Sequence, residues 1–164
     1  MAFDSFGNLP AGIHEYDIEG VKSEFVDSFP HSNTRSAILV GLIAYRKDVG
    51  SIVEDYEQIL DGSFVTAKND PNDVDCFISI NADILNALEP DQKTAFEVLV
   101  AGKATQSKYK VDAYLCAFVP ESHPNYHHYR TMRKYWLGEF GYDRNENPKG
   151  LVRVVNINPA LVAP

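Results

Sequence analysis

The chain has 164 residues, of which 45% are hydrophobic and 12% aromatic, so it can bury the core of one domain without disulfides or metals. Its formal net charge of −8 disfavours a broad contact with duplex nucleic acid. No run approaches the roughly 18 consecutive apolar residues that a membrane span requires. We therefore expect a single cytoplasmic domain over residues 1–164, without membrane or extended duplex partners.

Helical and strand patterns follow one another along the chain, which favours an α+β fold. Glycines and prolines in residues 1–30 predict an extended lead-in around the domain, with one short amphipathic piece near residues 21–29. Three helices are expected, over about residues 33–48, 86–101 and 125–140. Four strands are expected: one from residue 58 into a Gly-Ser turn, and three over residues 73–80, 109–119 and 151–157.

Both cysteines, Cys76 and Cys116, lie in apolar runs that predict buried strands, which favours reduced core thiols over a disulfide or a metal site. Alternation along a strand places Cys76 on the face opposite Asp75, whereas Cys116 shares the face of Asp112. We therefore expect that the two thiols do not pair.

A strand carries the pair Asp73 and Asp75, whose side chains point to the same face because they are two residues apart. Two like charges this close are costly without a cation, and Mg²⁺ favours carboxylate oxygens while keeping water or phosphate ligands. Asp112 is the candidate third carboxylate, because burying it unpaired in an otherwise apolar strand would be expensive. The pattern predicts a metal site for phosphoryl or nucleotidyl transfer.

Upstream of these carboxylates, Gly62 lets a phosphate approach the backbone closely, and the Ser63 hydroxyl and the turn amides can donate to phosphate oxygens. This is not a P-loop, because the GxxxxGK[ST] pattern is absent. A structural alternative is that the polar residues 69–73 simply form a turn stabilised by side-chain hydrogen bonds. The combination of both features on consecutive strands favours the functional interpretation.

Together, Gly62-Ser63, Asp73-Val74-Asp75 and the later Asp112 resemble the nucleotidyltransferase superfamily, in particular its minimal members related to the MNT antitoxins. This resemblance covers about residues 58–119, and a looser similarity to an uncharacterised group of bacterial nucleotidyltransferase-like proteins covers residues 9–157. It implies a mixed β-sheet flanked by helices, with two Mg²⁺ ions held by the three aspartates.

The resemblance also implies transfer of a nucleoside monophosphate from a nucleoside triphosphate to a hydroxyl of a protein, RNA or small-molecule acceptor. By position, Gly62 and Ser63 would contact the triphosphate, and Asp112 would help to deprotonate the acceptor. Many family members have a second glycine and an arginine shortly after the Gly-Ser turn. Phe64 to Lys68 stand there instead, and Lys68 could supply the basic contact.

Basic residues gather late in the chain, where Arg130 and Arg133 lie on the expected helix over residues 125–140. They could receive the β and γ phosphates if that helix packs beside the site, although a solvated basic face is equally open. Trp136 on the same helix could stack a base, but aromatic residues at this spacing more often pack a helix against a sheet.

Two non-enzymatic interpretations stay open: a degenerate nucleotidyltransferase fold that binds a partner protein, and a nucleotide sensor without turnover. The chain is too short for a separate acceptor-recognition domain, so an acceptor would bind in trans or across a homodimer. By analogy alone, a toxin–antitoxin or phage-defence setting fits best.

Overall fold

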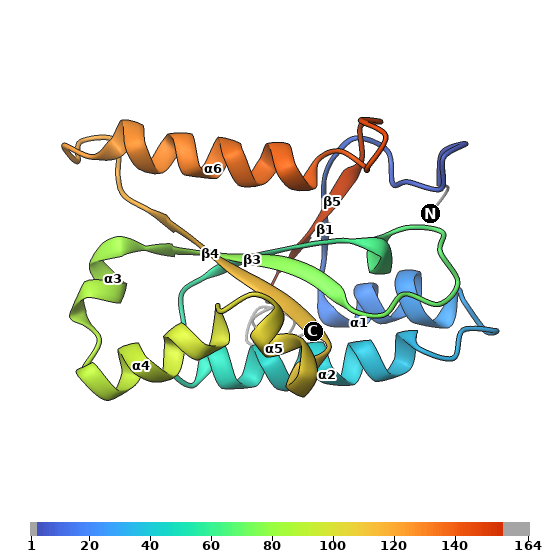
Figure 1. Ribbon diagram of the computed structural model, residues 1–164, viewed down its shortest axis with the longest axis horizontal. Helices are drawn as coiled ribbons and strands as arrows, with labels where there is room; N and C mark the ends of the chain where they lie inside the picture. The colour runs from blue at the N-terminus through green and yellow to red at the C-terminus, as the bar shows by residue number, and fades with distance from the viewer. Residues whose placement is uncertain (1–2, 156–164) are drawn as a thin grey trace, which may run out of the picture.

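A computed structural model describes residues 3–155 and shows a five-stranded sheet with helices on both faces (Figure 1). Its strands lie in the order β1-β5-β2-β3-β4. The strands are β1 (Gly12–Tyr16), β2 (Glu57–Asp61), β3 (Val74–Asn81), β4 (Val111–Phe118) and β5 (Gly150–Val154). The β1–β5 and β3–β4 pairs are parallel and the other two pairs are antiparallel. The protein is therefore of the α+β class with a mixed sheet.

Helices α2, α4 and α5 cover one face of the sheet, and the long α6 crosses the other (Figure 1). The helices are α1 (Ile18–Lys22), α2 (Arg35–Gly50), α3 (Ala82–Ala87), α4 (Pro90–Leu99), α5 (Lys103–Tyr109) and α6 (Tyr126–Phe140). Two single turns complete the set, a π-helical turn at Ser23–Asp27 and a 3₁₀ turn at Ser63–Val65. Alternation in β3 sends Cys76 and Ile78 to the larger core beside α2, while Phe77 enters a smaller core beneath α6.

Several predicted elements are confirmed. The helix expected over residues 33–48 is α2, that over residues 125–140 is α6, and the strand expected over residues 73–80 is β3. Both cysteines are free and buried, Cys76 in the larger core and Cys116 in the smaller one. They lie on opposite faces of the sheet, as strand alternation predicts.

The helix expected over residues 86–101 is wrong in its bounds, because the chain forms α3 and then a separate α4. Leu88 is extended (ψ 143°), and Glu89 and Gln92 form a capping box that begins α4 at Pro90. The strand expected over residues 109–119 begins only at Val111. Before it, α5 ends at Tyr109, and the residue that caps it, Lys110, has a left-handed backbone conformation (φ 56°) that separates the helix from the strand.

The lead-in is more than a wrapping segment. Gly12–Tyr16 forms the edge strand β1, in register with β5 from Gly12 and Gly150 onward. The expected amphipathic piece corresponds to α1 and the π-helical turn, which bury Val21 and Phe25. The last strand ends at Val154, and residues 156–157 of the predicted strand lie outside the described residues.

Between residues 3 and 155, no helix is both long and apolar enough to cross a membrane.

Candidate functional site

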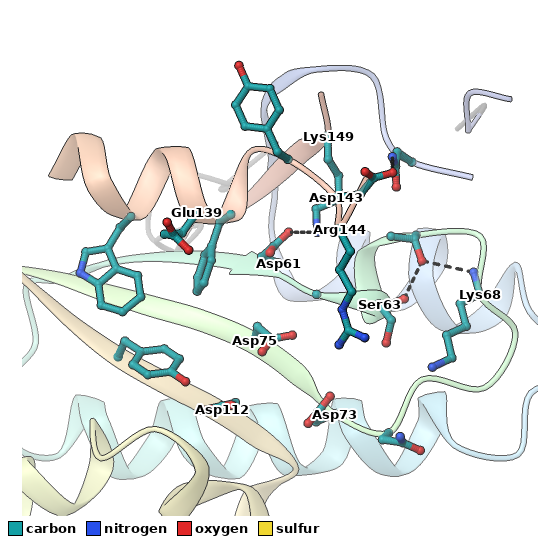
Figure 2. A pocket seen from close by; sticks show the side chains of 18 of the residues that line it. Asp61, Ser63, Lys68, Asp73, Asp75, Asp112, Glu139, Asp143, Arg144 and Lys149 are labelled. Carbon is teal, nitrogen blue, oxygen red and sulfur yellow. Dashed lines mark hydrogen bonds and ion pairs between the residues drawn. The ribbon is translucent and has the colours of Figure 1, made fainter. Parts of the chain in front are cut away.

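A row of carboxylates crosses three neighbouring strands on the face that α6 covers. Asp61 at the end of β2 lies directly opposite Asp75 near the start of β3, and Asp75 lies opposite Asp112 near the start of β4. Paired residues in a sheet point to the same face, and Asp73 follows the same alternation. The four carboxylates line one cavity of about 810 Å³, in which Asp61, Asp75 and Asp112 follow one another across the sheet (Figure 2). The structure thus brings the three predicted aspartates together and adds a fourth.

The electrostatics of this row favour a bound cation. Burial, and then the charges of Asp73, Asp61 and Asp112, raise the pKa of Asp75 to about 6. Asp112 is only 5% exposed, and its Oδ1 atom has no hydrogen-bond partner within residues 3–155. An unpaired buried carboxylate oxygen beside other carboxylates is costly unless a cation or donor approaches it.

Lys149, just before β5, is a cation of the site that the sequence pattern did not reveal. Its Nζ atom lies 2.7 Å from Asp61 Oδ1, and both side chains are more than nine-tenths buried. Burial still raises the pKa of Asp61, although the Lys149 ammonium opposes that effect. Lys149 therefore compensates Asp61, and leaves Asp73, Asp75 and Asp112 for another cation.

The donor set fits Mg²⁺, because hard carboxylate oxygens are the protein ligands this ion prefers. In the described part of the chain, no group of three or more His, Cys, Asp or Glu side chains forms a ready-made metal cage. Mg²⁺ in phosphoryl-transfer sites is commonly held by one or two carboxylates together with substrate phosphates and water. Asp75 and Asp112, with Asp73 beside them, would hold the ion in this way.

The sequence predicts that Gly62 allows the close approach of a phosphate, but the structure shows that the Asp75 carboxylate requires a glycine here. A Cβ atom at this position would lie 1.8 Å from Asp75 Oδ2, and the backbone φ of 77° is one that side chains rarely adopt. The missing side chain at Gly62 therefore makes room for the Asp75 carboxylate. Ser63 lines the same cavity, in the 3₁₀ turn that follows.

A buried arginine organises the segment between Ser63 and Asp73. Arg35, at the first turn of α2, is 0% exposed and its guanidinium also lies 3.6 Å from the Phe29 ring centroid. The guanidinium donates to the carbonyl oxygens of Phe25, Phe64, Thr66, Lys68 and Asn69. One side chain thus replaces the regular backbone pairing that this segment lacks. The sequence contains no local signal for this role, since the bonds join residues up to 34 positions apart.

Three cations border the carboxylates in the same cavity: Lys68, Lys103 and Arg144. All three are exposed, and none of their charged groups forms an ion pair with a residue in the range 3–155. Figure 2 shows the Arg144 side chain reaching from the loop after α6 toward the space bounded by Ser63, Asp73 and Asp75. Lys68 was predicted as a basic contact, whereas Arg144 and Lys103 were not.

The structure does not bring Arg130 and Arg133 to this cavity. They line a separate cavity of about 400 Å³, where Arg133 Nη1 lies 2.7 Å from Glu57 Oε2. Glu57 pairs with Ser79, four residues along the strands from the Asp61–Asp75 pair, which corresponds to about 13 Å. Because α6 runs along the strands, its first half covers the far end of the sheet, and only its last turns reach the acidic cavity.

Aromatic residues from the second half of α6 form one wall of the acidic cavity. Trp136 packs in the smaller core, with its ring centroid 4.9 Å from that of Tyr114 and 6.3 Å from that of Phe77. Tyr135 and Tyr142 line the cavity as well, but they are 51% and 52% exposed. Packing thus accounts for the Trp136 ring, although its buried Nε1 atom has no hydrogen-bond partner within residues 3–155, while the two tyrosines leave aromatic surface open at the rim.

Fold and site together define an α+β protein with an acidic cavity, bordered by cations that form no ion pair with any described residue. The chain belongs to the family of unknown function DUF6932, whose model matches residues 1–155. No curated protein matches the chain. No solved structure matches it either.

Proposed function

We propose that this protein is a Mg²⁺-dependent nucleotidyltransferase that moves a nucleoside monophosphate from a nucleoside triphosphate to a hydroxyl group. The observation that carries the proposal is that the carboxylates of Asp61, Asp73, Asp75 and Asp112 share one cavity with three cations that form no ion pair within residues 3–155. The spacing of Gly62-Ser63, Asp73, Asp75 and Asp112, which resembles the nucleotidyltransferase superfamily, supports the same reaction.

A ligand with charge of only one sign would attract either the carboxylates or the cations of this cavity and repel the other set. A bare divalent cation would suit Asp73, Asp75 and Asp112, but Arg144 and Lys68 would repel it. A polyphosphate alone would suit the cations and would be repelled by the carboxylates. A polyphosphate that carries Mg²⁺ would suit both sets, because Asp73, Asp75 and Asp112 would hold the metal while Lys68 and Arg144 would face the phosphate charge.

In the proposed reaction the acceptor oxygen forms a bond to the α-phosphorus, and the bond from that phosphorus to the bridging oxygen of pyrophosphate breaks. Bound Mg²⁺ supplies Lewis-acid stabilisation of the phosphate charge. We assign the Asp112 carboxylate as the group that accepts the acceptor proton, and its buried Oδ1 atom, which has no hydrogen-bond partner within residues 3–155, supports this role. Ser63 and the turn amides donate to phosphate oxygens. The cations of the cavity balance the negative charge of the pyrophosphate that leaves.

The size of the cavity fits two reactants. About 810 Å³ lies in the upper part of the usual range for ligand sites, roughly 300 to 1,000 Å³. A triphosphate can therefore bind beside part of an acceptor, which we propose is a hydroxyl of a protein, an RNA end or a small molecule, presented in trans or across a homodimer. The free buried cysteines suit a reducing compartment, so we place the activity in the cytoplasm. By analogy alone, a toxin–antitoxin or phage-defence role is the biological setting we propose.

The binding test is calorimetric titration of ATP, GTP, CTP and UTP into the full chain, with and without Mg²⁺. Wild type is compared with Asp75→Asn and Asp112→Asn, and with the matched control Asp55→Asn, an exposed carboxylate outside the cavity. We expect Mg²⁺-dependent binding of at least one triphosphate by wild type and Asp55→Asn, and its loss in the other two variants. Absence of triphosphate binding by folded wild type contradicts the proposal.

The turnover test follows transfer of an α-³²P label and release of pyrophosphate in the presence of a cell extract as the source of acceptors. Label on a protein, RNA or small molecule, absent with Asp112→Asn, supports the transferase. Mg²⁺-dependent binding without any transfer would instead support the nucleotide-sensing alternative.

A further inference from the structure

The N-terminal segment before β1 contacts both loops that border the acidic cavity. The Ala67 amide donates to the Gly7 carbonyl (2.8 Å), which ties the segment to the turn after Ser63. The Gly150 amide donates to the Leu9 carbonyl (2.9 Å) at the start of β5. Between these two backbone bonds, Asn8 is only 4% exposed and lines the cavity. The segment therefore joins two parts of the site that are about 80 residues apart in the chain.

The side chain of Asn8 acts on the loop that carries Arg144. Its Nδ2 atom donates to Asp143 Oδ2 at 3.0 Å. Asp143 Oδ1 in turn accepts from the backbone amides of Asn145 (2.8 Å) and Asn147 (3.0 Å). Hydrogen bonds from Asn147, with that from Asn8, hold the pKa of Asp143 well below its usual range, so this acceptor stays ionised. These hydrogen bonds therefore hold the backbone on both sides of Arg144.

Arg144 combines a fixed backbone with a free charged group. Its guanidinium reaches toward Ser63 and Asp73 (Figure 2), yet no described residue forms an ion pair with it. A guanidinium offers donors in a planar fork that matches two phosphate oxygens, and preorganisation of its base lowers the entropic cost of binding. The carboxylates would meanwhile be occupied by the metal.

We infer that Arg144 binds the pyrophosphate portion of the substrate, and that Asn8 is a positioning residue that acts through Asp143 on Arg144. This inference rests on the proposed function and assigns the phosphate-binding role to the loop after α6 instead of to the first half of that helix. It also gives the N-terminal segment a role in the site.

The probe is inorganic tripolyphosphate with Mg²⁺, which lacks a base and an acceptor and so reports the polyphosphate contacts alone. Titrations use the full chain as wild type, Arg144→Gln and Arg144→Lys, with Arg130→Gln as a matched exposed arginine outside the cavity. We expect about a 10- to 100-fold rise in Kd for Arg144→Gln, the range for losing charged hydrogen bonds. Arg144→Lys retains part of the affinity, and Arg130→Gln is unchanged.

A double-mutant cycle separates positioning from general stability. We expect Asn8→Ala to raise the Kd about three- to tenfold in wild type and less than twofold in the Arg144→Gln background, because the contact it positions is already gone. Equal effects in both backgrounds would reduce Asn8 to a structural role and overturn its part of the inference. Circular dichroism melts check that each variant is folded.

Failure of this inference differs from failure of the proposed function. If wild type binds Mg²⁺-tripolyphosphate and Arg144→Gln binds it equally well, Arg144 is excluded while the proposed reaction stands. If wild type binds neither this probe nor any nucleoside triphosphate, both proposals fall together.

Discussion

Removing the charge of Asp75 should change how the stability of the metal-free protein depends on pH. The folded structure raises the pKa of Asp75 from its usual value of 3.8 to about 6, chiefly by burial and then by the charges of Asp73, Asp61 and Asp112. The folded state binds the Asp75 proton more tightly than the unfolded state does. The contribution of this proton to the free energy of unfolding is therefore fully present below about pH 4. It is lost as pH rises through about 6.

The magnitude follows from the same two values. A pKa difference of about two corresponds to about 3 kcal/mol of unfolding free energy, at about 1.4 kcal/mol for each pH unit. Asp75 is half-buried, so water screens part of this, and we expect a loss of about 1 to 3 kcal/mol between pH 4 and 7. Asp75→Asn cannot ionise and should lack this component.

The assay is urea denaturation of wild type and Asp75→Asn at half-unit steps from pH 4 to 8, in EDTA. Comparing the two proteins cancels the contributions of titrating groups that do not interact with Asp75, such as Asp143, whose pKa is lowered and whose effect falls at more acid pH. Wild type should lose stability relative to the variant as pH rises from 5 to 7, and millimolar Mg²⁺ should restore it in wild type alone. Parallel pH profiles would refute the reasoning that the carboxylate row is an uncompensated charge cluster.

Three substitutions test the supports of the site, each by urea denaturation at pH 7. Gly62→Ala should lose at least about 2 kcal/mol, and its Mg²⁺-dependent ATP binding, because its Cβ would lie 1.8 Å from Asp75 Oδ2 in a strained backbone conformation. Arg35→Met should lose about 3 kcal/mol or more, because buried carbonyls lose their donor. Lys149→Met should lose about 3 to 5 kcal/mol by leaving Asp61 buried and unpaired, and this loss should shrink as the pH falls and Asp61 takes up a proton.

Matched substitutions of the same chemistry control these measurements. Gly138→Ala, in α6 with open space around its Cβ, should keep wild-type stability or gain some. Arg130→Met and Lys110→Met remove exposed charges outside the acidic cavity and should stay within about 0.5 kcal/mol of wild type. A Lys149→Met variant as stable as wild type at pH 7 would show that Asp61 is already protonated there.

The carboxylates of the site could be predicted from sequence because their signal is local. Asp73 and Asp75 share a face by strand alternation alone, and Asp112 stands out as a charge in an apolar run. Their meeting depends on the parallel pairing of β3 with β4, which no local pattern in the sequence specifies. The break between α3 and α4 also had a local signal, Glu89-Pro90, that the apolar periodicity across residues 86–101 obscured.

The missing parts of the site depend on long-range pairing. Lys149 reaches Asp61 because β5 inserts between β1 and β2, and no residue near Lys149 in the sequence indicates that order. The short edge strand Gly12–Tyr16 is largely exposed and lacks the apolar alternation that would have identified it. For Arg133, a basic helix face could be predicted from the sequence, but the end of the sheet that this face covers could not.

The buried polar contacts around the cavity are themselves an argument for a ligand. Replacing a buried ion pair such as Asp61–Lys149 by apolar side chains is often neutral or stabilising, so folding alone does not require it. Arg35, which is 0% exposed, holds backbone carbonyls at the cavity where no regular structure does, and Asn8 holds the Asp143 carboxylate. These side chains fix three distant segments around the acidic row, and burying their polar groups costs desolvation free energy. Such a cost is characteristic of sites whose charges are set in place before a charged ligand arrives.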